Sequence, residues 1–189
     1  MIEKFIKRTA QCLDRQKVPY MIIGGQAVLL YGRPRLTRDI DITLGVDTDK
    51  LASIEGVCEK LKLRILVEDA KDFAQDTKVL PTEEPHSKVR VDFIFSFTPY
   101  EAQAIKNAKK VLMDDYPVKF ASCEDLIIHK MVAGRAIDEE DVASILAKNR
   151  DTIDFKYIEK WLSEFAKMAE QEGISARFNG LLRGHSEQA

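Results

Sequence analysis

Apolar positions in the first part of the chain recur at helical spacing in some segments and in short strand-like runs in others. Residues 2–16 carry apolar side chains at helical spacing and predict an amphipathic helix that ends before Pro19. Residues 20–23 are apolar and β-prone, and residues 39–44 and 89–95 predict two further strands. The clearest strand signals therefore lie in the first two-thirds of the chain.

Weaker patterns occupy the segments between these strands. The other elements expected here are helices at 26–31, 51–61 and 99–109, a strand at 63–67, and a hairpin formed by 110–113 and 118–120. Residues 68–88 are polar and contain Pro81 and Pro85, so we expect an irregular loop or a short hairpin there.

The last third of the chain has helical periodicity. Ser122 and Asp125 resemble a capping box that starts a helix ending at Gly134, and Asp138 is a good N-cap for the next helix, which runs to about Lys148. A final helical pair is expected at 154–170 and 172–183. Strands followed by helices predict an α+β fold. The 189 residues suit one domain, or a small catalytic domain with a helical appendage.

Composition narrows the class of protein. A hydrophobic content of 45% is ordinary for a globular protein with a core. The net charge is −2, from 29 basic and 31 acidic residues, so any contact with RNA or DNA must come from a local patch. No apolar run is long enough to span a membrane, and the first residues do not resemble a signal peptide. Three scattered cysteines indicate reduced thiols, so we expect a cytoplasmic protein.

Two short motifs carry the candidate chemistry. The pair Gly24-Gly25 separates a strand from a helix expected to begin near Gln26, where free backbone N–H groups hold phosphate. Asp39 and Asp41 alternate along a predicted strand, so both carboxylates point to one face and repel each other unless a cation lies between them. Oxygen ligands favour Mg²⁺ or Mn²⁺ over Zn²⁺. A phosphate site beside a divalent metal suggests a nucleoside triphosphate.

These motifs resemble those of a known family. The segment 23–26, followed by Arg-x-Thr-x-Asp-Ile-Asp at 35–41, resembles the nucleotidyltransferases of the DNA polymerase beta superfamily. The second motif is similar to the branch that contains AbiEii-type abortive-infection toxins and antibiotic nucleotidyltransferases. The segment 130–135, with Asp138 and Asp141, resembles the C-terminal helix pair of that family.

The resemblance implies a fold and a domain organisation. It runs from about Tyr20 to about Trp161. It implies a small mixed twisted sheet of the nucleotidyltransferase type with flanking helices. The catalytic core is then expected over 1–120, with a helical C-terminal region over 121–189 packed on it.

The resemblance also implies an activity, which is the metal-dependent transfer of a nucleoside monophosphate from a triphosphate to an acceptor hydroxyl with release of pyrophosphate. Asp39, Asp41 and Asp92 would be the catalytic residues and the ligands of Mg²⁺ or Mn²⁺, with Asp92 also the general base. The family often has Ser where Gly25 stands, and its hydroxyl contacts the terminal phosphate. Here backbone amides, or Gln26, would have to make that contact. The residues implied in nucleotide binding are Gly24, Gly25, Gln26, Arg35, Thr37, Arg38 and Lys130.

Several alternatives stay open. Lys130 equally fits a lysine with a buried stem, and Asp138 and Asp141 fit the positive end of a helix. Arg33, Arg35 and Arg38 suit solvation, triphosphate contact or a polynucleotide backbone.

The function also has alternatives. The same fold could serve a catalytically silent nucleotide-binding or toxin–antitoxin component with a cognate antitoxin as partner, whereas a phosphohydrolase fits the carboxylates but not the glycine pair. The sequence does not specify which hydroxyl receives the nucleotide: a tRNA end, a small molecule such as an antibiotic, and a protein hydroxyl all stay open. The resemblance of the Arg-x-Thr-x-Asp-Ile-Asp motif to the toxin branch slightly favours a nucleic acid as the acceptor.

Overall fold

The computed structural model describes residues 2–184, which form two compact units. Of the described residues, 2–26 and 36–121 form the first, here called the sheet unit. Residues 27–35 and 122–184 form the second, the helical unit. The expected division into a core over 1–120 and a helical region over 121–189 stays a prediction, and residues 185–189 of that region lie outside the described ones.

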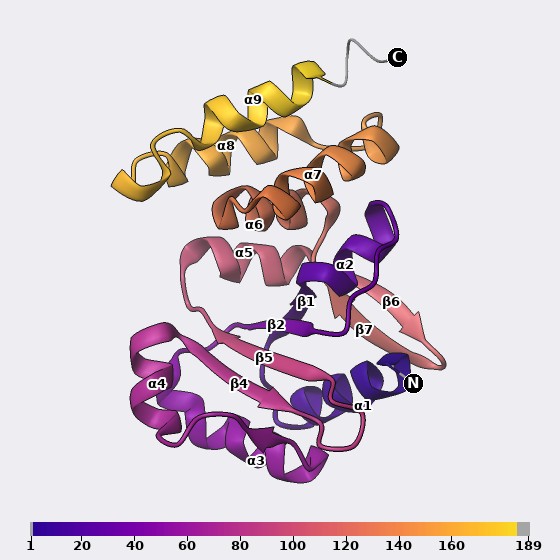
Figure 1. Cartoon of the computed structure of the whole chain (residues 1–189), viewed down its shortest axis with the longest axis vertical. Helices are drawn as coiled ribbons and strands as arrows, with labels where there is room; N and C mark the ends of the chain where they lie inside the picture. The colour runs from indigo at the N-terminus through magenta and orange to yellow at the C-terminus, as the bar shows by residue number, and fades with distance from the viewer. Residues whose placement is uncertain (1, 185–189) are drawn as a thin grey trace. The chain divides into compact units, whose positions relative to one another are not determined.

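The sheet unit is built on a mixed sheet (Figure 1). Its strands are β1 Tyr20–Ile23, β2 Ile40–Leu44, β3 Arg64–Ile65, β4 Val79–Glu83, β5 Arg90–Phe95, β6 Lys109–Met113 and β7 Tyr116–Phe120. Their order across the sheet is β3-β4-β5-β2-β1-β7-β6. β2 runs parallel to β5, and β1 runs parallel to β7, while the other neighbouring pairs are antiparallel. The predicted α+β fold with a mixed sheet is confirmed.

Helices cover the sheet of this unit. They are α1 Ile2–Arg15, α3 Leu51–Leu61, α4 Ala70–Thr77 and α5 Pro99–Asn107, with a short 3₁₀ turn η1 at Thr48–Lys50. α1 packs against α3 and β7. The fully buried Tyr20 of β1 directs its hydroxyl toward Asp14 of α1, so this face of the sheet points toward α1. Ile22 and Ile42 lie on the same face and are almost completely buried.

The segment 68–88 differs from the expected irregular loop or short hairpin. It contains α4, whose first turn is capped by the Asp69 side chain accepting from the Asp72 N–H, and β4, which lies inside the sheet. Pro81 stands in the middle of β4, and its carbonyl accepts from Leu66, just beyond the short edge strand β3. Proline has no N–H to donate. At Pro81 that N–H would point toward β3 and the edge of the sheet, where its absence is tolerated.

The helical unit contains α6 Cys123–Ala133, α7 Ala136–Asn149, α8 Phe155–Phe165 and α9 Ile174–Gly184, with the short 3₁₀ turn η2 at Ala169–Gln171. It also holds most of α2, which spans Gly24–Tyr31. The expected cap of α6 is confirmed, because Ser122 accepts from the Asp125 N–H and Gly134 ends the helix in the left-handed region at φ 63°. Across residues 2–184, no helix has the length and apolar character needed to cross a membrane.

Helix α7 begins earlier than expected. Its N-cap is Arg135, so Asp138 occupies the third position inside the helix and is not the N-cap. The carboxylate of Asp138 accepts from the backbone N–H of Arg135 and so caps the start of the helix. It also accepts from the side chain of Lys130, which lies in α6. Only tertiary contacts show this second role.

Candidate active site

Two of the expected catalytic carboxylates lie opposite each other on neighbouring strands. β2 and β5 are parallel, and Asp41 is paired in register with Asp92. Residues paired in this way point to the same face of a sheet. Ile40 and Ile42 alternate with Asp41 and are buried, as expected, whereas Asp41 is only half-buried. The strand pairing thus brings together two aspartates that are far apart in the sequence.

Asp39 lies one residue before β2, which begins at Ile40 and not at Asp39 as expected. Its side chain is exposed. Burial raises the pKa of Asp92, and the negative charge of Asp39 raises it further. Arg90 opposes both effects, because its Nη2 donates to the two carboxylate oxygens of Asp92 at 3.3 and 3.4 Å. Asp39 is therefore close enough to Asp92 for their charges to interact.

The glycine pair packs directly against this group. α2 begins at Gly24 and not near Gln26, so the two glycines belong to the first turn of the helix. Gly24 has φ +62°, and a Cβ there would lie 1.8 Å from Oδ2 of Asp41. A Cβ on Gly25 would lie 2.4 Å from Oγ1 of Thr37. No side chain fits at either position without a shift of its neighbours, and the first N–H groups of a helix have no intrahelical partner.

The other expected nucleotide-binding residues of the sheet unit have different surroundings. Gln26 is buried, and its Nε2 donates to the Asp39 carbonyl over a long 3.4 Å. Thr37 packs against Gly25, and Arg38 is exposed. The structure therefore places Thr37 against the glycine turn and Gln26 against the backbone of Asp39.

The donor set fits a hard divalent cation. Carboxylate oxygens are the ligands that Mg²⁺ and Mn²⁺ prefer, and the raised pKa of Asp92 reflects partly buried negative charge that a cation would compensate. Among residues 2–184, the structure contains no group of three or more histidine, cysteine or acidic side chains arranged to hold a metal ion. The fit therefore rests on the chemistry of the donors and on the pairing of Asp41 with Asp92.

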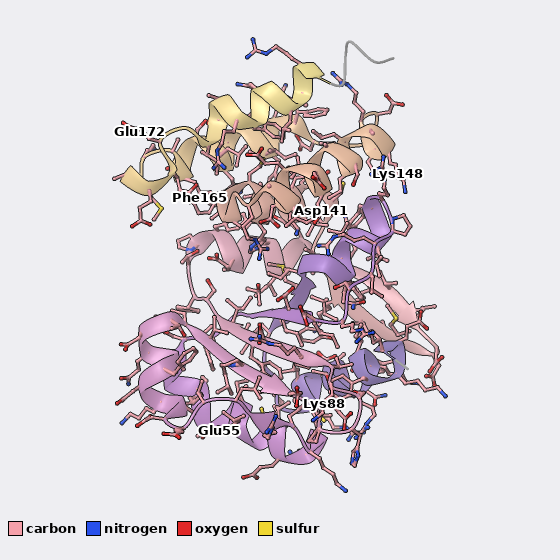
Figure 2. The ribbon with its side chains drawn as sticks, in the orientation of Figure 1. Glu55, Lys88, Asp141, Lys148, Phe165 and Glu172 are labelled. Carbon is pink, nitrogen blue, oxygen red and sulfur yellow. The ribbon has the colours of Figure 1, made fainter. Side chains whose placement is uncertain are left out.

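A second charged cluster lies within the helical unit. Nζ of Lys130 is 2.7 Å from Oδ1 of Asp138 and 2.8 Å from Oδ2 of Asp141, and all three residues are buried. Arg35 donates two hydrogen bonds to the two oxygens of Asp141, at 3.1 and 3.0 Å, and Arg135 binds Asp138 in a similar way. Figure 2 labels Asp141, which projects from α7. We call these five residues the ion network.

The ion network keeps both of its aspartates ionised. Burial works against ionisation, but hydrogen bonds from Arg35 and Lys130 outweigh it and lower the pKa of Asp141. Hydrogen bonds from Arg135 and Lys130 lower the pKa of Asp138 in the same way. Two residues expected to contact a nucleotide, Arg35 and Lys130, thus have carboxylate partners of their own in the structure.

Two features of these sites were not predicted from the sequence. Arg90 was not recognised as a partner of Asp92, although alternation along a strand places residues two apart on one face. The partnership of Asp141 with Arg35 was also missed. Its only sequence signal is the presence of two aspartates three residues apart in a helix with an apolar face.

Comparison with known proteins identifies the family. Residues 17–183 match the family model described as the nucleotidyl transferase AbiEii toxin of a type IV toxin–antitoxin system. The chain belongs to the AbiEii nucleotidyltransferase family. The match confirms the resemblance seen in the glycine and aspartate motifs. Among curated proteins, none matches the sequence.

Solved structures show that the AbiEii-family chain shares its fold with antibiotic nucleotidyltransferases. The solution structure of the antibiotic-resistance factor ANT(2'')-Ia has a TM-score of 0.54 at 19% identity, covering 99% of this chain and 97% of that one. A crystal structure of ANT(2'')-Ia with adenylyl-2''-tobramycin gives 0.57 at 17% identity, covering 93% and 98%.

An antigenic nucleotidyltransferase-like protein from Paracoccidioides brasiliensis gives a TM-score of 0.55 at 16% identity, covering 94% of this chain and 91% of that one. At these identities the likeness concerns the fold. The expected nucleotidyltransferase-type sheet with flanking helices is confirmed.

Proposed function

We propose that this chain transfers a nucleoside monophosphate from a nucleoside triphosphate to an acceptor hydroxyl and releases pyrophosphate. Membership of the AbiEii nucleotidyltransferase family supports the reaction class. The observation that carries the assignment of residues is the in-register pairing of Asp41 with Asp92, with Gly24 packed against Asp41.

In this proposal Asp39, Asp41 and Asp92 would hold Mg²⁺ or Mn²⁺. The bound metal supplies positive charge for the triphosphate oxygens and lowers the pKa of the acceptor hydroxyl. Asp41 and Asp92 suit this task because their paired strands present both carboxylates on the same face of the sheet, and Asp39 is close enough to Asp92 for their charges to interact. Asp41 and Asp92 are fixed by the strands, which limits their freedom before a substrate binds.

Asp92 would take the proton of the acceptor hydroxyl. Its raised pKa makes it a better base than an ordinary aspartate, and Arg90 keeps that rise moderate. The hydroxyl oxygen then attacks the α-phosphorus. The bond between the α-phosphorus and the oxygen bridging to the β-phosphorus breaks, and pyrophosphate leaves with that oxygen.

The glycine turn would position the triphosphate. The backbone N–H groups at the start of α2 can donate to phosphate oxygens, and the absence of side chains at Gly24 and Gly25 allows close approach. Arg38 is exposed and carries a positive charge suited to a phosphate. Thr37 and Gln26 support the turn and the backbone of Asp39.

In this proposal the acceptor hydroxyl belongs to a nucleic acid, a small molecule or a protein. The toxin description of the family favours a nucleic acid, whereas one related structure carries an adenylylated antibiotic, tobramycin. The net charge of −2 makes broad polynucleotide binding unfavourable, so a nucleic-acid acceptor would have to bind through a small basic area.

Thermal stabilisation and pyrophosphate release together test this function. Each of ATP, GTP, CTP and UTP is added with and without Mg²⁺, first in melting experiments and then with a cell extract as a source of acceptors. We expect a Mg²⁺-dependent rise in melting temperature with at least one nucleotide, together with pyrophosphate release. Stabilisation without pyrophosphate release would instead support a catalytically silent nucleotide-binding protein.

A further inference from the structure

Strand β6 forms one edge of the sheet within the sheet unit. It is the outermost strand on its side, with β7 as its neighbour (Figure 1). The other edge strand, β3, has two residues, whereas β6 has five. Folded proteins commonly keep edge strands short or covered, because their unpaired backbone groups can bond to another chain. β6 is long enough to form a backbone ladder with another strand.

The backbone of β6 directs hydrogen-bonding groups away from β7. In an antiparallel pair, residues that exchange two hydrogen bonds with the residue opposite alternate with residues that do not. Leu112 lies opposite Pro117, which has no N–H, so these two residues cannot exchange both bonds. The N–H and C=O of Leu112 therefore point outward, and by alternation those of Lys110 do as well.

The side chains along this edge change sign from one end to the other. Lys109 and Lys110 begin the strand and are exposed. Leu112 follows near its centre and is 70% exposed, although it is apolar. Asp114 and Asp115 form the turn into β7, and their side chains are 55% and 86% exposed. The edge thus runs from positive through apolar to negative.

Lys7 of α1 neutralises only part of the negative end. It binds Asp115 and lies 3.6 Å from an oxygen of Asp114. One ammonium balances one of the two carboxylates, so a negative charge remains beside the edge. That charge can attract a second cation from outside the chain.

An antiparallel copy of this edge matches its charges. When Leu112 lies opposite Leu112 of a second copy, position 110 lies opposite position 114, and position 109 lies opposite position 115. Each lysine then faces an aspartate, and the two-fold axis repeats both pairs. Parallel pairing in register would instead place lysine against lysine, which is destabilising. Lysines that served only to block pairing would need no aspartates at the far end of the same edge.

We propose that β6 pairs with β6 of a second copy of this chain, antiparallel and with Leu112 at the two-fold axis. The pairing continues the sheet from one copy into the other and covers the exposed Leu112 side chains. One short strand buries little area, so the dimer is reversible, with a dissociation constant on the order of 10–100 µM. β1 and β7 lie between β6 and the aspartate strand β2, so the proposal does not depend on the proposed function.

Sedimentation equilibrium of the full chain, over a range from about 5 to about 500 µM, measures the pairing. We expect the average mass to rise with concentration from 21.5 kDa toward twice that value. A mass that stays at the monomer value over the whole range would overturn the proposal.

Two charge-swapped variants locate the interface. Lys110→Asp places a carboxylate opposite Asp114, and Asp114→Lys places an ammonium opposite Lys110. Each variant alone should dimerise at least about 10-fold more weakly than the wild type, because like charges then face each other. A mixture of the two should regain the dimer, since every opposed pair is again one acid and one base. Wild-type dimerisation by either variant alone, or a mixture as weak as its components, would refute the register.

Lys71→Asp is the matched control. It makes the same change of charge on the exposed surface of α4, away from β6. We expect this variant to dimerise like the wild type, and melting curves of all three variants check that each one folds. If Lys71→Asp weakened the dimer as much as Lys110→Asp does, net charge and not the β6 edge would govern assembly, and the proposal would fail.

Hydrogen exchange of the wild-type chain gives a readout that needs no substitution. The N–H of Leu112 points outward in the monomer and gains an acceptor in the dimer, so its exchange should slow as the protein concentration rises. The N–H of Val111 points toward β7 by the same alternation, so its exchange should not change through pairing. A dimer that leaves the exchange of Leu112 independent of concentration would have its interface elsewhere and would overturn the proposal.

Discussion

Asp41 lies directly opposite Asp92 in the parallel pairing of β2 with β5. This pairing places two carboxylates side by side on one face of the sheet, while Gly24 packs against Asp41 at a distance that admits no side chain. A negatively charged group next to the start of a helix is an arrangement in which a divalent cation and a phosphate can be bound together.

Removing the carboxylate of Asp39 or of Asp41 should abolish metal-dependent nucleotide binding without unfolding the protein. We expect this for Asp39→Asn and for Asp41→Asn, because each loses a charged ligand while the repulsion between the remaining carboxylates decreases. Calorimetry with Mg²⁺ and nucleotide, together with melting curves, measures both effects. Wild-type affinity in both variants would show that these aspartates do not hold the metal.

Replacing Asp92 should affect turnover more than binding. In Asp92→Asn the other two aspartates can still hold the metal-bound triphosphate, but the proton acceptor is lost, so turnover should fall by ~10²-fold or more. The test compares initial rates with nucleotide dissociation constants. Near-normal turnover would contradict the role of general base.

The variant Arg90→Gln tests whether Arg90 sets the pKa of Asp92. Arg90 holds the pKa of Asp92 down against burial, so its loss should raise that pKa and move the acidic limb of the pH–rate profile to higher pH. An unchanged acidic limb would show that another group limits the rate at low pH.

The glycine turn can be tested with a single methyl group. Gly24→Ala places a Cβ where Oδ2 of Asp41 lies, at a backbone φ of +62°, and should destabilise the fold by about 1–3 kcal/mol while weakening nucleotide binding. Gly173→Ala is the control, since a Cβ there meets nothing within 4 Å. Chemical denaturation and nucleotide titration give the two values. Equal behaviour of both variants would refute the close packing at Gly24.

His129 should make stability depend on pH. Burial lowers its pKa to about 4 from the ordinary 6.5, and its Nε2 is shielded from solvent. The unfolded chain therefore binds the proton first as the pH falls, so the free energy of unfolding should be fully retained above pH 6.5 and decrease between pH 6.5 and 4, by at most about 3 kcal/mol.

Unfolding curves at several pH values measure this dependence. His129→Gln should flatten it, because glutamine does not titrate. The lowered pKa values of Asp138 and Asp141 act in a different range, since their contribution is present above the ordinary aspartate pKa and is lost only at lower pH. A slope that persists unchanged in His129→Gln would exclude His129 as its origin.

Local sequence patterns predicted the elements that carry the aspartates. The strands around Asp41 and Asp92 follow from alternation and β-propensity, and the helix at Ser122 follows from its cap. The segment 68–88 differs from its prediction. A proline normally argues against a strand, but the N–H that Pro81 lacks would lie on the side of β4 that faces the short edge strand β3. Which side of a strand faces the edge of the sheet depends on the tertiary fold, so a local sequence pattern does not show it.

The ion network could not be predicted for a similar reason. Arg35 and Asp141 are 106 residues apart, and nothing local indicates that they meet. The sequence shows Lys130 on an apolar helix but not its two carboxylate partners, which come from the following helix. Charges that pair across elements become recognisable only once the packing is known.

Following the α- and γ-phosphates of the nucleotide in separate labelling experiments tests the central claim most directly. The protein is incubated with Mg²⁺, a cell extract and a nucleoside triphosphate labelled either at the α- or at the γ-phosphate, with Asp41→Asn as the inactive control. The account predicts that the α-label becomes attached to an acceptor while the γ-label is released as pyrophosphate, and that neither occurs with the variant. Transfer of the γ-label to the acceptor, or α-label transfer that survives in Asp41→Asn, would contradict it.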